Sequence, residues 1–397
     1  MSVTASLLDV RFIALLSVMG LLRFVVPTRY YVVFGVTCSA ALLGLAAPQT
    51  LVVISVSTLL LVYPIHRLTR CAERRGASKR FSSVLLTFGM VVLVALLAWF
   101  KLYRHFALPW LGAAWIGPET LALVGFSYFI LRAIGFLHIQ SILKTTESNP
   151  LTLLFFLLFP PTLTSGPIQK FQDFRQQVCS PEPLSAPLLR NVAYRLTRGY
   201  FRKMVLAVVI NDMAGKLLAV QHPSVCVSVA SLAALYVFFY FDFAGYSDIA
   251  IAFGLLLGVK VPENFRQPFL ATTASQFWRN WHITIVDWFR DQVFIPLGGM
   301  KGSRLRAASL AFLVMFLCGF WHGVAWGYIA WGAWHGLVLF TEALSGAKPI
   351  PPGRHQGMEY WSRVLWTNAR VAFGGAFFLP SETALRLLGG FTNWSMF

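Results

Sequence analysis

Apolar stretches long enough to cross a lipid bilayer recur along this chain. Clear examples are residues 31–47, 83–100 and 121–139, and a spanning helix needs about 20 mostly apolar residues. In hydrocarbon, every backbone polar group must be satisfied within the segment, so helices are the expected spanning form. Only 12% of the residues are charged, against about 25% in soluble domains. We therefore predict an all-α, polytopic membrane protein of about 10 or 11 transmembrane helices. Further interfacial and re-entrant helices are expected, all within one domain over residues 1–397.

The formal net charge of +18 is concentrated in short segments between the apolar stretches. The strongest is the loop predicted at 66–80, HRLTRCAERRGASKR. Basic loops of this kind stay in the cytoplasm, so we place this loop there and the N-terminus outside. In a soluble protein such a charge would suggest nucleic-acid binding. Here anionic lipid headgroups and an acidic cytosolic partner account for it, and no nucleic acid is expected.

The stretch 151–159 is apolar but ends at Pro160. About ten residues are too few to span a bilayer, so we predict a re-entrant or interfacial segment there and leave the topology around 141–175 open. A polar linker without helical periodicity is predicted at 176–187. The next segment, RNVAYRLTRGYFRK at 190–203, has arginines at helical spacing. It is predicted to be a basic amphipathic helix that faces solvent or headgroups.

A long apolar run at 225–257 suits one and a half spans and is interrupted by the sequence FDFAGYSD. Asp242 and Asp248 in this sequence need partners if they lie in hydrocarbon. Arg279 and Arg290 are the predicted partners. A structural ion pair is the favoured interpretation, and contact with a substrate is the alternative.

The stretch 264–337 has two contrasting halves. Residues 264–299 are aromatic and charged, too polar to cross a bilayer. Trp281 and Ile285 belong to a set of apolar residues at helical spacing, which predicts an amphipathic aromatic helix at the membrane surface. Residues 310–337 are apolar enough to cross, yet they carry two histidines. An ionisable residue inside an apolar span is costly and is a functional candidate by default.

His322 lies between Gly319 and Gly323 in the apolar half. A neutral imidazole in an apolar site is a suitable general base near neutral pH, and the glycines would let backbone or substrate approach closely. The alternative is a core histidine that is hydrogen-bonded to a neighbouring helix. His335 would lie about 220° around a shared helix from His322, so we predict a structural role for it. Further glycines make one unbroken helix doubtful.

Four stretches, taken in order, resemble the membrane-bound O-acyltransferase family. They are SGPIQKF at 165–171, YFDFAGYSDIAIAFGLLLG at 240–258, NFRQPFLATTASQFWRNWHITIVDWFRDQVFIPLGG at 264–299 and GFWHGVAWGYIAWGAWHG at 319–336. Within the bacterial branch, the short chain and PPTLTSGPIQKFQDF resemble the D-alanyl transferases of teichoic acids (DltB type). The run FRDQVFIPLGG instead resembles the O-acetyltransferases of polysaccharides (AlgI type). The first type is favoured.

The resemblance implies that His322 is the catalytic base and that His282 assists it by binding or orientation. An interfacial anchor is the alternative role for His282. The candidate substrate-binding residues around the two histidines are Trp278, Trp281, Trp321, Asn280 and Arg279. Trp278, Trp281 and Trp288 could line an acyl channel, but aromatic belts at the membrane interface are common, and we interpret these three residues as such a belt.

The resemblance also implies a reaction. A small activated acyl group, D-alanyl in preference to acetyl, would pass directly to a hydroxyl of a cell-envelope polymer. The donor would be a thioester on a cytosolic phosphopantetheine carrier protein or coenzyme A, and no bound cofactor or metal is expected. The five cysteines form no CxxC pair, which agrees with the absence of a zinc motif. The sequence contains no GxSxG elbow, P-loop or GxGxxG fingerprint, so the acyl group must arrive already activated.

The implied setting is the bacterial cytoplasmic membrane, with membrane lipids around a multi-pass protein and an SGNH-like or DltD-like extracytoplasmic partner. An acidic carrier would dock on a basic cytoplasmic face, for which the candidate residues are Arg195, Arg198, Arg202, Lys301 and Arg304. A passage containing His322 would then be reached from both sides of the membrane.

Two alternatives stay open. One is an O-acetyltransferase of an exopolysaccharide or of peptidoglycan. The other is a transporter of an acyl group or lipid-linked precursor, because intramembrane charges and broken helices suit transporters as well. An absolute need for the imidazole of His322 would separate an enzyme from a transporter.

Overall fold

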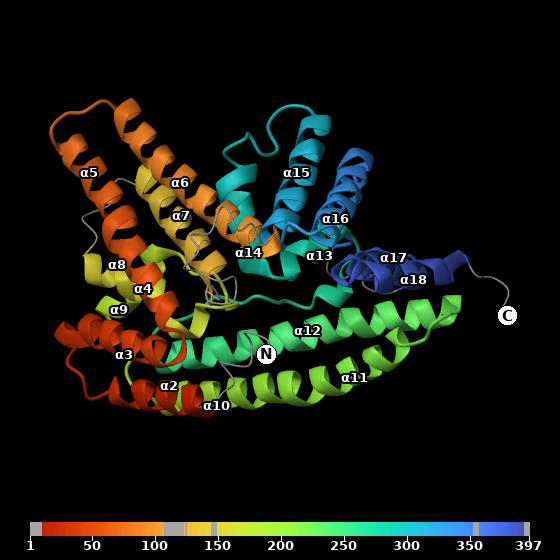
Figure 1. Ribbon diagram of the computed structural model, residues 1–397, viewed down its shortest axis with the longest axis horizontal. Coiled ribbons are helices and arrows are strands. Elements are labelled where there is room, and N and C mark those ends of the chain that lie inside the picture. Colours follow the sequence, from red (N-terminus) through yellow and green to blue (C-terminus); the bar gives the residue numbers. More distant parts are fainter. Residues whose placement is uncertain (1–9, 107–122, 124, 144–148, 352–356, 393–397) are drawn as a thin grey trace. The chain divides into compact units, whose positions relative to one another are not determined.

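The computed structural model describes residues 10–106, 123, 125–143, 149–351 and 357–392, and this part of the chain is almost entirely helical (Figure 1). In chain order, the α-helices are α2 (Val10–Leu22), α3 (Tyr31–Ala46), α4 (Pro48–Ser57), α5 (Tyr63–Arg74), α6 (Lys79–Phe106), α7 (Phe126–Leu143), α8 (Pro150–Leu158), α9 (Phe171–Cys179), α10 (Ala186–Tyr200), α11 (Ala207–Leu218), α12 (Val225–Leu256), α13 (Ala274–Asn280), α14 (Ile283–Phe289), α15 (Arg304–His322), α16 (Trp326–Ser345), α17 (Met358–Gly374) and α18 (Ser381–Gly389).

Shorter helical segments join them. The π-helical segments are Thr58–Val62, Phe201–Leu206 and Arg290–Phe294, and the 3₁₀ turns are Thr28–Tyr30, Pro160–Thr162, Pro268–Leu270, Gly375–Phe378 and Gly390–Thr392. Within the described ranges, the β structure is limited to one isolated bridge between Phe265 and Trp281. The predicted all-α fold is confirmed.

Several helices have the length and composition needed to cross a bilayer. Among the described residues, five stretches qualify on both counts: Thr28–Ala46, Pro48–Arg74, Lys79–Tyr103, Val225–Leu256 and Arg304–His322. Two shorter apolar helices are Ile13–Leu22 and Phe126–Ile139. The predicted polytopic membrane protein is confirmed, while the total number of spans stays a prediction.

The chain divides into two compact units. The first unit consists of Met1–Leu196 with Asp248–Pro262, and the second of Thr197–Ser247 with Glu263–Phe397. Two of the boundaries fall inside α10 and α12, and the third follows Pro262. Each unit contains buried residues of its own. The expectation of one integrated domain over the whole chain stays a prediction.

Helix α8 is a core element of the first unit. It is apolar, and all of its residues from 152 to 158 are buried. Phe155 and Phe156 contact Phe174 with ring centroids 5.2 and 5.4 Å apart. The Phe155 ring also lies where a side chain on Gly35 of α3 would be, only 2.3 Å from a Cβ built there. Burial on every side argues against an interfacial position, which would leave one face exposed, while the re-entrant alternative stays a prediction.

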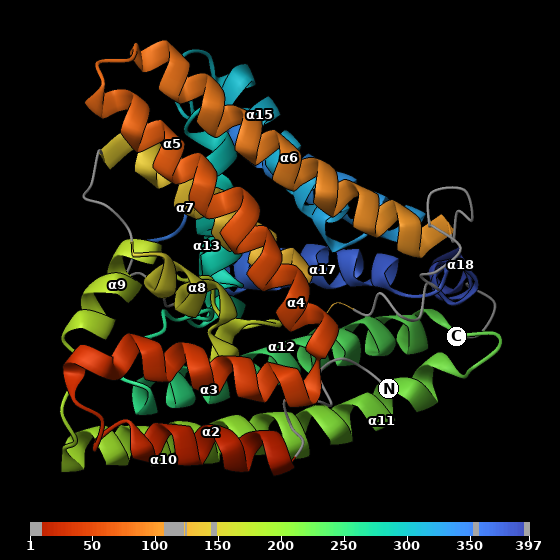
Figure 2. The same cartoon turned by 60° about the vertical axis from the view of Figure 1, so that its left-hand side comes forward.

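The predicted basic loop at 66–80 is wrong. Helix α4, its π segment and α5 form one continuous helix that ends only at Arg74, and α5 packs against α6 (Figure 2). After the cap residue Arg75, Gly76 adopts the left-handed conformation and the Ala77 amide donates to the Ala72 carbonyl, which is a Schellman C-cap. Arginine and alanine are good helix formers, so the basic segment extends the helix instead of ending it.

The segment before α11 is more helical than predicted. The expected linker at 176–187 is helical through Cys179, at the end of α9. The predicted basic helix at 190–203 is confirmed, because α10 and the following π segment continue without a break into α11.

Helix α12 runs for 32 residues without the predicted interruption. Its two carboxylates are neutralised within their own units: Asp248 pairs with Arg195 at 3.0 Å in the first unit, and Asp242 pairs with Lys203 in the second. The predicted arginine partners are wrong, and Arg290 pairs with two carboxylates of its own segment. Paired carboxylates do not force a helix to break, because the partner supplies the compensation that hydrocarbon lacks.

Helices α15 and α16 form a tightly packed pair in the second unit (Figure 1). The expectation that residues 310–337 are not one unbroken helix is confirmed, because the chain turns between His322 and Trp326. A Cβ built on Gly319 would lie 2.4 Å from the Tyr328 carbonyl oxygen and 3.0 Å from the Gly332 Cα. Small residues on facing helices allow this close backbone approach.

Replacing Gly332 by alanine should destabilise this helix pair. The new methyl would meet the Met315 carbonyl oxygen at 2.8 Å, and backbone atoms cannot move aside cheaply, so we expect a loss of about 1–3 kcal/mol. Thermal unfolding of the purified protein in detergent measures it. Gly375→Ala is the matched control, because a Cβ there has nothing within 4 Å and the backbone has φ near −60°. Equal stability of the two variants would contradict the packing account.

Candidate active site

His282 lies at a break between two short helices. The predicted single amphipathic helix over this segment is wrong, because α13 ends at Asn280 and α14 begins at Ile283. Between them Trp281 is extended and pairs with Phe265, and His282 has φ 45° and ψ 50°. This left-handed conformation is uncommon outside glycine, although histidine adopts it more readily than most residues. Such backbone positions cluster at functional sites.

The buried side chain of Asn264 holds this break. Its Oδ1 accepts hydrogen bonds from Thr284 Oγ1 at 2.7 Å and from the Thr284 amide at 3.3 Å, and it lies 3.4 Å from His282 Nδ1. The Asn264 carbonyl also accepts from the Ile283 amide at 2.9 Å. An amide oxygen only accepts, so this contact favours a proton on His282 Nδ1, and in the neutral ring the lone pair is then on Nε2.

His282 is almost completely enclosed, with 5% of its surface exposed. Phe243 of α12 meets its ring edge-on at 4.5 Å, and Trp321 lies 6.4 Å away, both measured between ring centroids. Burial lowers the pKa of His282 well below its usual value, and the nearby His322 lowers it further. A general base works best with a pKa near the operating pH. His282 is therefore better suited to accept a hydrogen bond than to carry a proton.

His322 ends α15 and is only half-buried. Aromatic rings surround it, with centroids 4.8 Å away for Trp321, 5.1 Å for Trp331, 5.3 Å for Phe378 and 6.3 Å for Tyr328. Trp321 also contacts His282, so its indole touches both histidines. These contacts place both predicted catalytic residues in one aromatic cluster of the second unit.

The glycines beside His322 serve helix and ring packing. A Cβ on Gly323 would lie 2.4 Å from the Tyr328 ring, and Gly319 allows the approach of α16. The expected close backbone approach is confirmed. Its cause is the packing of protein groups against one another.

His335 lies inside the second unit, 1% exposed, with its ring against Trp331 at 4.8 Å and Trp278 at 4.9 Å. Its burial agrees with the predicted structural role. Trp331 contacts His322 as well. The two histidines therefore share a neighbour despite their separation around a single helix, because the chain reverses between them.

The remaining candidates differ in their surroundings. Trp278 is buried against Trp331 and His335, so its assignment to an interfacial belt is wrong. Trp281 is half-buried and stacks on Phe277 at 5.3 Å. The backbone carbonyl of Asn280 accepts from the Arg266 amide, while the Arg279 side chain is exposed. A substrate-binding role for these residues stays a prediction.

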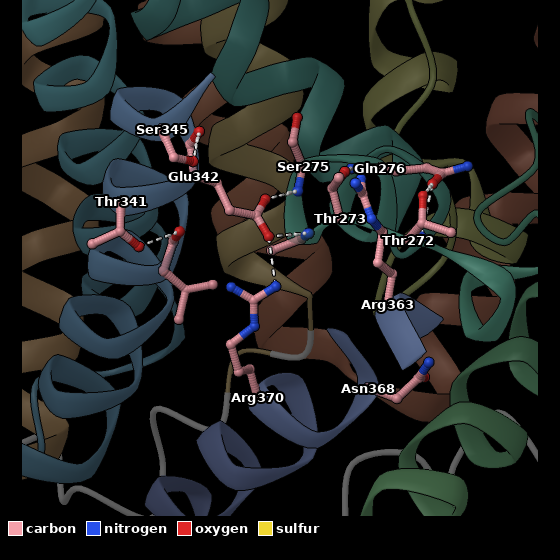
Figure 3. Close-up of polar contacts among 12 residues, drawn as sticks. Thr272, Thr273, Ser275, Gln276, Thr341, Glu342, Ser345, Arg363, Asn368 and Arg370 are labelled. Carbon is pink, nitrogen blue, oxygen red and sulfur yellow. Dashed lines mark hydrogen bonds and ion pairs between the residues drawn. The ribbon is translucent and has the colours of Figure 1, made fainter. Parts of the chain in front are cut away.

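Helix α13, which leads into Trp281 and His282, is anchored by Glu342 of α16 (Figure 3). The carboxylate accepts hydrogen bonds from the Ala274 and Ser275 amides at 2.8 and 3.1 Å and pairs with Arg370 of α17 at 2.6 Å. A negative charge is favourable at a helix N-terminus, and a helix of seven residues is too short to be stable alone. This clamp was missed in the sequence, although a carboxylate in an apolar helix was a visible signal.

The basic residues predicted to dock an acidic carrier protein differ in their surroundings. Arg195 is paired with Asp248, so it does not belong to an open docking face, whereas Lys301 and Arg304 are exposed. Among the described residues, no group of three or more His, Cys, Asp or Glu side chains is placed to hold a metal ion.

This chain belongs to the membrane-bound O-acyltransferase family, whose model matches residues 75–347. The match includes His282, His322 and Glu342 and ends before Arg370 and Phe378.

Named relatives lie within the bacterial branch of the family. A probable alginate O-acetylase of Pseudomonas syringae pv. tomato is 32% identical over 275 residues, 67% of this chain and 53% of the relative. A teichoic acid D-alanyltransferase of Streptococcus thermophilus is 34% identical over 273 residues, 64% of this chain and 66% of the relative. A peptidoglycan O-acetyltransferase of Helicobacter pylori is 32% identical over 296 residues, 64% of this chain and 54% of the relative. The chain thus spans about half of the alginate and peptidoglycan relatives and somewhat more of the D-alanyltransferase.

The state of His282 can be read by ¹⁵N NMR of histidine-labelled protein, with His282→Gln to assign the signal. We expect a neutral ring with the proton on Nδ1 at pH 6, because burial lowers the pKa of His282. The unfolded chain takes up a proton below about pH 6.5 and the folded one does not. This residue's contribution to stability is therefore present above that pH and lost as the pH falls below it. An imidazolium signal at pH 6 would contradict the assignment.

Removing the carboxylate of Glu342 should loosen α13. Glu342→Ala leaves a largely buried guanidinium and two amides without their acceptor, and we expect a loss of about 2–4 kcal/mol in thermal or denaturant unfolding. Glu359→Ala removes an exposed carboxylate that pairs with Arg363 on α17, and it should change stability little. If Arg370→Ala and the Glu342→Ala, Arg370→Ala double variant show additive losses, the two residues are not coupled and the clamp is wrong.

Proposed function

We propose that this protein transfers a small activated acyl group, D-alanyl in preference to acetyl, to a hydroxyl of a cell-envelope polymer, with His322 as general base. The observation that carries this proposal is the half-buried imidazole of His322, placed beside the buried His282 through Trp321. Family membership favours an enzyme over a transporter.

The proposed chemistry needs one proton carrier. The Nε2 or Nδ1 lone pair of neutral His322 would take the proton from the acceptor hydroxyl as its oxygen attacks the carbonyl carbon of the thioester. The new oxygen–carbon bond forms, the carbon–sulfur bond breaks, and the departing thiolate receives the proton from His322. His282, neutral and held by Asn264, would orient the reacting groups by accepting a hydrogen bond.

The preference for D-alanyl rests on how much of each relative's length this chain covers. This chain covers 66% of the D-alanyltransferase from Streptococcus thermophilus, against 53% of the alginate O-acetylase, so it is closer in extent to the first. O-acetyl transfer is the second candidate. It is supported by the O-acetylase of Pseudomonas syringae, which aligns with 67% of this chain.

The proposed setting is the bacterial cytoplasmic membrane. The donor would be presented from the cytoplasm on an acidic phosphopantetheine carrier protein, or as coenzyme A thioester, near the exposed basic residues Lys301 and Arg304. Steering by these charges would weaken as salt rises. An extracytoplasmic SGNH-like or DltD-like partner would receive or complete the transfer.

The test compares wild type, His322→Gln and His322→Ala, reconstituted in lipid, with D-alanyl carrier protein and acetyl-coenzyme A as separate donors. Ester formation on a hydroxyl acceptor should fall about 10²–10⁴-fold in both variants, the range that a positioned general base contributes. His222→Gln, at an exposed histidine in the same unit, is the control and should remain active. Activity above a tenth of wild type in His322→Gln would overturn the role of His322. Use of acetyl-coenzyme A alone would select the O-acetyl candidate, and no transfer with either donor would overturn the proposed function.

A further inference from the structure

The segment Gly375–Phe378, a 3₁₀ turn after α17, is seated on the start of α16. A Cβ built on Gly327 of α16 would lie 2.3 Å from the Phe377 carbonyl oxygen, so a glycine is needed for this approach. Gly374 likewise lies against the ring of His335, whose Nε2 would be 2.3 Å from a Cβ there. Two glycines, Gly327 on α16 and Gly374 on α17, thus allow the close contacts that fix the backbone position of Phe378.

Phe378 brings its ring to the catalytic cluster from this segment. It meets His322, Tyr328 and Trp331 edge-on, each at 5.3 Å between ring centroids. Phe239 of α12 lies on it at 5.9 Å. Phe378 is therefore a wall of the space around the His322 imidazole, contributed by a part of the chain that follows the residues matched by the family model.

The rings around His322 differ in how much of them is covered. Trp321 and Trp331 are 9% and 6% exposed, and Trp331 is packed between His322 and His335. Phe378 is only half-buried. The tryptophans therefore form the inner side of the site, and Phe378 lies on the side that remains partly open.

We infer that Phe378 sets the upper size of the acyl group that this protein transfers. This inference rests on the proposed function. A general base acts within hydrogen-bond reach of the hydroxyl that attacks the acyl carbonyl, so the chain attached to that carbonyl must lie among the rings that contact His322. A phenyl ring in contact with the imidazole occupies space that a longer chain would need, while acetyl or D-alanyl requires little of it.

Removing the Phe378 ring should create space beside His322 and should shift the preference of the protein toward longer acyl chains. Each methylene that a longer chain buries in apolar surroundings favours binding by about fourfold, so two or more extra carbons give a change above tenfold. The reverse substitution, Phe378→Trp, adds volume on the same side and should exclude chains that wild type still accepts.

The experiment measures kcat/KM for acetyl, butyryl and hexanoyl thioesters of one carrier or of coenzyme A, each with wild type, Phe378→Ala and Phe378→Trp. In Phe378→Ala the hexanoyl-to-acetyl ratio should rise at least tenfold, and in Phe378→Trp the butyryl-to-acetyl ratio should fall. A ratio between donors is unaffected by a general loss of active protein, so a merely structural role would leave it unchanged. Phe373→Ala is the matched control, because it removes a phenyl ring of the same unit that contacts Trp334 and Phe391. Its hexanoyl-to-acetyl ratio should equal that of wild type.

Each outcome decides something. An unchanged ratio in folded Phe378→Ala, with wild type active on acetyl or D-alanyl donors, overturns the size limit and leaves the proposed function standing. Wild type without activity on any thioester overturns both. If Phe378→Ala fails to fold, Phe378→Leu, which shortens the side chain and keeps it apolar, is measured in its place, and an unchanged ratio there overturns the inference.

Discussion

The close backbone contact between α15 and α16 is the constraint on which the candidate site depends. With glycines at 319 and 332 the two helix backbones meet directly, and the turn after His322 returns the chain at once. Trp331 then lies against both His322 and His335. A looser pair of helices would place these rings apart, and the imidazole at the end of α15 would lose the aromatic surroundings that give it an apolar yet reachable position.

A second constraint holds the other histidine. Helix α13 and the break after it are too short to keep a conformation by themselves, so their geometry comes from groups distant in sequence. Asn264 fixes the break from one side and Glu342 fixes the start of α13 from the other. Since Glu342 lies on α16, the helix that carries Trp331 also positions the segment that carries His282. The two histidines are thus tied to one element by packing and by hydrogen bonds.

The features that the sequence predicted are those that depend on local composition. The length of apolar runs indicated the helices, and a histidine in an apolar span indicated His322. Features that depend on distant partners were missed or wrong. The conformation of His282 depends on its contact with Asn264. The carboxylates of α12 pair with basic residues of α10 and of the π segment that follows it. Phe378 belongs to a segment in which the sequence shows no motif. Hydrophobic periodicity describes one element at a time, and it carries no information about which elements meet.

Helix α12 has a further consequence for the membrane around this protein. Its 32 residues make a rod about 48 Å long, whereas the hydrocarbon layer is about 30 Å thick. Fitting it by tilt alone would take about 50°, beyond the range of roughly 0–40° found for transmembrane helices. Part of α12 therefore lies beyond the acyl chains, in the headgroup layer or against protein.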